Sequence, residues 1–163
     1  MDPFFAWIES SAPSVWLRES LSVFAFPMVL TLHTVGLAFL VGPAMALGLR
    51  LLGVARQIPV GALRGLLPIM WGGFWLNAIT GTALVVAYPT KALTNPLFYI
   101  KLALIGGAIL GLMKMRGAVM GNPESMRPES LRTWAVSSIC LWVLAIFAGR
   151  WLAYTYGRLL VGH

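Results

Sequence analysis

The residue with the clearest chemical potential in this chain is His33, an imidazole inside an apolar run. Between Phe24 and Leu49 it is the sole titratable side chain, and the next charge is Arg50. A titratable group that deep in a membrane helix is costly, and it usually marks a cofactor, ion or proton site. His33 is therefore the first candidate for a ligand of a metal or cofactor.

Three further polar side chains interrupt apolar segments: Asn77, Lys101 and Arg150. With a helical rise of about 1.5 Å per residue, His33 and Asn77 fall a few Å to the outer side of the bilayer centre. Lys101 and Arg150 fall about 9 Å to that same side. Each buried cation costs about 2.5–3.5 kcal/mol, and the spans hold no Asp or Glu to pair with it. The sequence thus predicts either a bound anionic ligand, such as the two haem propionates, or two cations that snorkel to the outer headgroups.

Gly36 follows His33 by about one helical turn and shares its face, so it would leave the flat space that a porphyrin ring needs. A copper site is the weaker interpretation, because Met28 and Met45 are not spaced with His33 as a compact trio. Cys140 is the only cysteine, which excludes a disulfide within one chain. Haem is therefore the cofactor that these residues favour, ahead of a copper or proton role.

The composition indicates which elements must position these residues. Apolar residues make up 59% of the chain and charged residues 10%, far outside the range of soluble proteins. Four stretches approach or exceed the roughly 20 residues that a membrane span needs: 21–49, 62–88, 96–115 and 132–156. The sequence predicts one all-α transmembrane domain over residues 1–163, an up-down-up-down four-helix bundle. The net charge of +7 then reflects topology and anionic headgroups, and nucleic acid is excluded as a partner.

The ends of the chain predict its orientation. Residues 3–19 mix aromatic and charged side chains, which is typical of a short interfacial helix, here broken near Pro13. Basic residues gather around the first and third connections, which we expect in the cytoplasm. The sequence therefore predicts a multi-pass protein of the bacterial inner (cytoplasmic) membrane, with both termini outside.

Several short patterns carry a family resemblance. The segments Phe26–Pro27, Thr31–Thr34 and Gly149–Trp151 resemble a large uncharacterised family of four-helix bacterial membrane proteins, a domain of unknown function, over nearly the whole chain. More distantly, His33–Gly36 and Leu97–Leu102 resemble the first-helix histidine and third-helix lysine of HemJ-type membrane proteins, whose helical layout is similar to that of CopD-type copper-resistance proteins. HemJ-type proteins carry b-type haem and are linked to protoporphyrinogen oxidation. The resemblance implies that His33 is the axial haem ligand and that Lys101 is a functional basic residue beside the cofactor.

This chain departs from that pattern because it has no second histidine within the spans; the other is the final residue, His163. The sixth iron position would be open, or filled by Met28, Met70, a neutral Lys101 or His33 of a second copy. An open position favours ligand or substrate chemistry, whereas a closed one favours electron transfer.

The leading hypothesis is a membrane-embedded haem b protein that transfers electrons between the quinone pool and an outer-face, periplasmic partner. In it, His33 ligates iron, Gly36 admits the ring, and Asn77 orients the imidazole or a propionate. Lys101 and Arg150 pair with the propionates. The alternatives are a cofactor-free accessory or anchor subunit of a larger membrane complex, with His33 bonded to Asn77 or a carbonyl, and a HemJ-like oxidase or copper-handling protein. An oligomeric electron-transfer or accessory subunit is favoured over a stand-alone enzyme.

Overall fold

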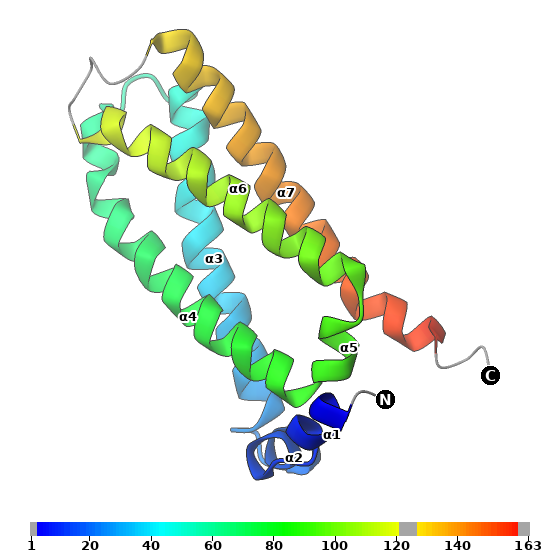
Figure 1. Cartoon of the computed structure of the whole chain (residues 1–163). Helices are drawn as coiled ribbons and strands as arrows, with labels where there is room; N and C mark the ends of the chain where they lie inside the picture. Colours follow the sequence, from blue (N-terminus) through cyan, green and yellow to red (C-terminus); the bar gives the residue numbers. More distant parts are fainter. Residues whose placement is uncertain (1–2, 121–126, 160–163) are drawn as a thin grey trace.

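Four long helices dominate the structure, a computed structural model that describes residues 3–120 and 127–159. They are α3 (Phe26–Leu51), α4 (Leu66–Ala87), α6 (Pro96–Val119) and α7 (Pro128–Leu159), and they run alternately up and down (Figure 1). Each contains a segment long and apolar enough to cross a membrane. The chain is therefore a multi-pass, all-α integral membrane protein, as predicted.

The observed helix ends differ from the predicted spans by a few residues. Residues 23–25 form a turn, so α3 begins later than expected, and a 3-10 helix, η1 (Val60–Gly65), precedes α4. The connection from α4 to α6 contains a short helix, α5 (Pro89–Leu93), and α6 begins sharply because Asn95 Oδ1 accepts from the backbone N–H of Leu97 at 3.0 Å. The terminal His163 lies outside the described residues.

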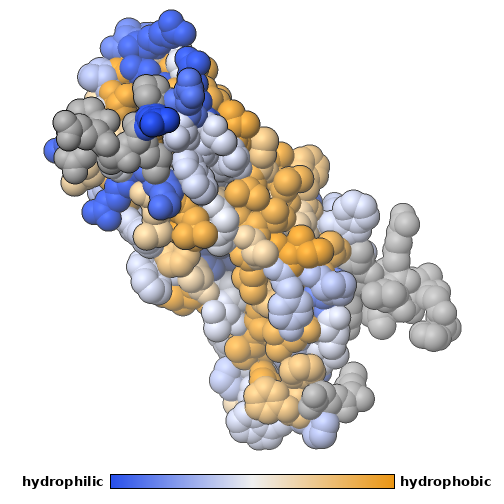
Figure 2. All heavy atoms as spheres, turned by 45° about the horizontal axis from the view of Figure 1, so that its top comes forward, coloured by the Kyte–Doolittle hydropathy of each residue, from blue (hydrophilic) through white to orange (hydrophobic). Residues whose placement is uncertain are grey.

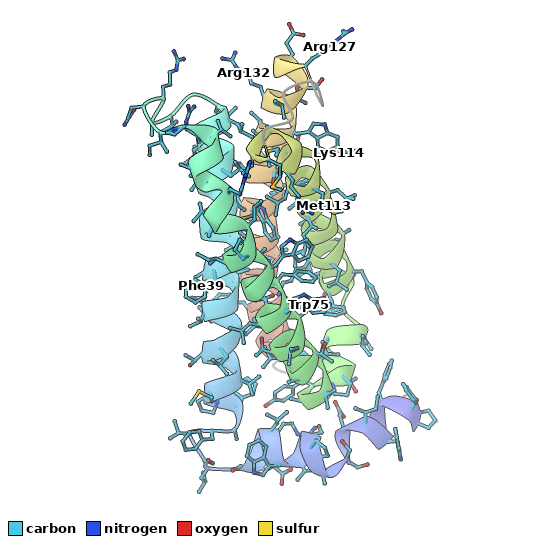
Figure 3. The ribbon with its side chains drawn as sticks, turned by 90° about the vertical axis from the view of Figure 1, so that its left-hand side faces the viewer. Phe39, Trp75, Met113, Lys114, Arg127 and Arg132 are labelled. Atoms are coloured by element: carbon cyan, nitrogen blue, oxygen red, sulfur yellow. The ribbon has the colours of Figure 1, made fainter. Side chains whose placement is uncertain are left out.

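The N-terminal segment forms two helices, α1 (Pro3–Glu9) and α2 (Ala12–Glu19), which lie across one end of the bundle (Figures 1 and 3). The interruption falls at residues 10–11. Pro13 instead lies in the first turn of α2, where a missing N–H leaves no hydrogen bond unmade. The predicted short N-terminal helix is thus present as two helices, with the break slightly earlier than expected.

Polar contacts attach α2 to the end of α4. Ser14 is buried, and its hydroxyl donates to Val86 O at 2.9 Å. Arg18 Nη1 donates to Ala87 O at 3.2 Å, and Arg18 Nη2 donates to Glu9 O at 2.9 Å. The last carbonyls of a helix have no partner within it, so α2 satisfies those of α4 and also brings a cation to the negative end of its dipole.

The bundle consists of two tightly packed helix pairs, α3 with α4 and α6 with α7, joined through α3 and α7. By contrast, α4 and α6 make at most marginal backbone contact. We call the end with the α3–α4 connection the basic end, since hydrophilic side chains gather there (Figure 2), and the other the α1–α2 end. The basic end carries seven Lys and Arg residues: Arg50, Arg56, Arg64, Lys114, Arg116, Arg127 and Arg132.

Candidate functional site

The imidazole of His33 is held by a threonine on the neighbouring helix. His33 Nδ1 lies 3.1 Å from Thr80 Oγ1, and the Thr80 hydroxyl donates to Leu76 O at 2.6 Å. A hydroxyl has one proton, so with that proton on the Leu76 carbonyl, Thr80 can only accept from the imidazole. His33 is consequently the Nδ1–H tautomer, and Nε2 carries the free lone pair.

The free Nε2 atom has no hydrogen bond to any residue of the two described ranges. The residue as a whole is half-buried between α3 and α4. A histidine that binds a metal almost always donates its other ring N–H to an acceptor, which fixes the tautomer and the ring orientation. The His33–Thr80 pair has this arrangement.

Asn77 lies at the level of His33, as its depth predicted, but it contacts the backbone. Its Nδ2 donates to the carbonyl oxygen of His33 at 2.8 Å. The sequence predicted that Asn77 orients the imidazole or a propionate. In the structure, Thr80 is the residue that orients the imidazole. Asn77 ties α4 to the α3 backbone at the residue that carries the ring.

Gly36 is a helix-packing residue in this structure. A Cβ on Gly36 would lie 2.8 Å from the backbone N of Asn77 and 3.1 Å from Gly73 O. Backbone atoms at that distance cannot move aside without separating α3 from α4. The expectation that Gly36 leaves space for a porphyrin ring is therefore wrong for this arrangement, because the α4 backbone fills that space.

Thr80 and Gly81 belong to the site but were missed from the sequence. A Cβ on Gly81 would lie 3.1 Å from His33 Cε1, so its absence gives the imidazole room against α4. A signal was available, since Asn77, Thr80 and Gly81 follow one another at i, i+3 and i+4 and share one helix face. Threonine inside an apolar helix commonly bonds its own backbone, which hid the role of Thr80.

Of the two cations predicted beside the site, Lys101 is half-buried and Arg150 is exposed. The Lys101 side chain packs against Gly149 of α7, where an added Cβ would lie 3.4 Å from Lys101 Cε. Arg150 is the next residue on α7 after Gly149, and the pairing of both cations with one anionic ligand stays a prediction.

The matching family model covers residues 4–155 and is described as a family of unknown function (DUF6644). The chain belongs to this family. No curated protein and no solved structure matches it. The resemblance to an uncharacterised family is thereby confirmed. The roles of the site residues in this DUF6644 protein are therefore inferred from the protein itself.

The apolar core of this DUF6644 protein lies away from the site. The buried apolar side chains of α3 all follow His33, and those of α6 all follow Lys101. They are Leu40, Val41, Ala44 and Leu47 on α3, and Ala108, Leu112, Met115 and Val119 on α6. The half of the bundle toward the α1–α2 end is therefore less filled by side chains of this chain, and the site lies in that half.

The donor set suits a cofactor that needs one or two protein ligands. Within residues 3–120 and 127–159 no three His, Cys, Asp or Glu side chains gather. Met70, one predicted sixth ligand, is a core residue ten positions before Thr80 on the same helix, about 15 Å away along its axis. Of the ligands considered within one chain, Met28 and Lys101 remain on the half of the bundle that carries His33.

Proposed function

We propose that this protein is a membrane-embedded b-type haem protein that transfers electrons between the quinone pool and a partner at the α1–α2 end. The observation that carries the proposal is the polarised imidazole. Its Nδ1–H donates to Thr80, and Nε2 has no partner in the described part of the chain. Neutral imidazole with a free Nε2 is the usual axial ligand of haem iron.

The residues around His33 would each have a distinct task. His33 would hold the haem iron, and Lys101, half-buried on α6, would face one propionate. Thr80 keeps Nε2 deprotonated, and Asn77 keeps the α3 backbone in place behind the ring. When bound, the haem would supply a reversible one-electron couple, whose potential depends on its axial ligands and burial.

The position of His33 along the bundle suits electron transfer between a membrane quinone and a partner at the α1–α2 end. His33 lies seven residues after the start of α3, about 10 Å along the helix axis from the α1–α2 end. A redox group at that depth would be close to a partner docked on that end and still open laterally to a membrane quinone. HemJ-like protoporphyrinogen oxidation would use the same histidine, but would in addition require substrate turnover.

A cofactor-free accessory subunit is the second candidate, and burial favours it. In each spanning segment at most 28% of the residues are buried within the chain. Most residues of the spans thus keep some surface open to lipid or to other membrane helices, as expected of a subunit that packs into a larger complex.

A visible absorption spectrum of the detergent-purified protein from haem-replete cells separates these candidates. We expect a Soret band that shifts on reduction with dithionite, its loss in His33→Ala, and its retention in His163→Ala, which removes the only other histidine. Size-exclusion chromatography checks that His33→Ala is folded, and imidazole added to His33→Gly should restore the band. A wild-type protein without a Soret band, or a folded His33→Ala protein that keeps it, would overturn the haem proposal.

A further inference from the structure

A groove separates α4 from α6 in the half of the bundle toward the basic end. It opens laterally and is lined almost entirely by apolar side chains. Leu67 and Phe74 line it from α4, and Ile109, Met113 and Arg116 from α6. It exists because α4 and α6 belong to different helix pairs and barely touch. Figure 3 shows this side of the bundle, with Trp75 labelled on α4 and Met113 on α6.

Arg116 gives the groove one cationic end in an otherwise apolar wall. Three other arginines at the basic end donate to carbonyls of their own surroundings: Arg50 to Ile58 O, Arg56 to Gly53 O and Arg64 to Met120 O. The Arg116 guanidinium makes no such bond within the described ranges. Its five donors are therefore available at the end of α6, near the depth of lipid headgroups.

The lining of the groove indicates what can occupy it. Its wall is almost entirely apolar and opens laterally, so an acyl chain of a membrane lipid can lie along it.

We infer that this groove is a binding site for an anionic phospholipid, with an acyl chain between α4 and α6 and the phosphate on Arg116. A guanidinium binds phosphate oxygens through two parallel hydrogen bonds. Basic pockets between transmembrane helices on the cytoplasmic side are suited to anionic headgroups. The lipid would fill the gap between the two helix pairs that the side chains of this chain leave open.

The inference is independent of the haem proposal. Arg116 lies fifteen residues after Lys101 on α6, about 22 Å along the helix axis. The two sites share no residue. A protein without haem can therefore still bind the lipid, and a protein without the lipid can still bind haem.

The test measures lipid preference in the purified full-length protein. We expect phosphatidylglycerol, added in detergent, to bind more tightly than phosphatidylcholine by native mass spectrometry, and to raise the thermal unfolding temperature more. Arg116→Gln should weaken phosphatidylglycerol binding about fivefold, the effect of one basic residue near an anionic surface. Lys114→Gln is the matched control, because Lys114 is an exposed cation on the same helix that does not line the groove.

A second pair of variants tests the apolar wall. Met113→Trp should fill the mouth of the groove and weaken binding of the acyl chain, whereas Leu110→Trp places the same side chain at an exposed position outside it. Equal binding of the two lipids, or equal effects of Arg116→Gln and Lys114→Gln, would overturn the inference. So would a Met113→Trp protein that changes its oligomeric state and retains its lipid, because the groove would then face another protein.

Discussion

At the scale of single residues, one hydroxyl decides what His33 can do. The Thr80 proton goes to the Leu76 carbonyl, so the imidazole must donate from Nδ1. The lone pair of the imidazole is thereby left on Nε2. No charged side chain nearby on α3 is needed for this. The reactivity of His33 is thus set by a residue 47 positions away in the chain.

Thr80→Val keeps the volume of this buried side chain but removes the acceptor. We expect a 10- to 100-fold loss of haem affinity, the usual effect of removing such a partner of a metal-binding histidine. Thr80→Ser retains the hydroxyl and should behave like the wild type. The Soret absorbance per mole of protein measures both variants. One such hydrogen bond in a membrane stabilises a bundle by only about 0.6 kcal/mol, so unfolding of Thr80→Val would not account for a loss of haem affinity. Unchanged haem affinity in Thr80→Val would contradict the assigned tautomer.

At the scale of elements, the α3–α4 pair is the unit that builds the site. His33 and Gly36 come from α3, while Gly73, Asn77 and Thr80 come from α4. The two glycines face each other, and a Cβ on Gly73 would lie 2.7 Å from Leu40 N and 2.8 Å from Gly36 O. Small residues at such a crossing allow the close backbone approach that stabilises helix pairs in lipid.

Gly73→Ala should push these two helices apart, and we expect a loss of about 1–3 kcal/mol, as for other overpacked contacts. Gly72→Ala is the matched control, since a Cβ on Gly72 has no atom within 4 Å. Unfolding in mixed detergent and SDS micelles measures both variants. A Gly73→Ala protein as stable as Gly72→Ala would show that the crossing is not as close as described.

At the scale of the whole molecule, charge is distributed unevenly between the two ends. The basic end holds most of the Lys and Arg residues, whereas α1, α2 and α5 cover the other end. Short loops rich in Lys and Arg remain in the cytoplasm. The bundle should therefore have its basic end, and the lipid groove near it, on the cytoplasmic side, with His33 toward the outer face.

Cysteine labelling tests this orientation in a Cys140→Ser background, which has no other cysteine. We expect Thr94→Cys, exposed at the α1–α2 end, to react with a membrane-impermeant maleimide in intact cells. Gln57→Cys, exposed in the connection at the basic end, should react only after the membrane is permeabilised. The opposite pattern would reverse the predicted topology.

The sequence by itself determined the fold class, the four spans and the shared depth of His33 and Asn77. These properties are local, because a bilayer demands long apolar helices and a helix advances by a constant rise per residue. The hydrogen bond from Asn77 to the His33 carbonyl confirms that the two residues lie at one level.

Only the tertiary structure decided which atoms meet. The rotation of each helix about its axis places Thr80 on the imidazole, fills the space beside Gly36 with the α4 backbone, and leaves Arg150 exposed. That rotation follows from close packing between helices about 40 residues apart in the chain, where small residues fit against backbone. Spacing along one helix carries no information about this contact, so the sequence predicted the depth of each polar side chain but not the partner it would have.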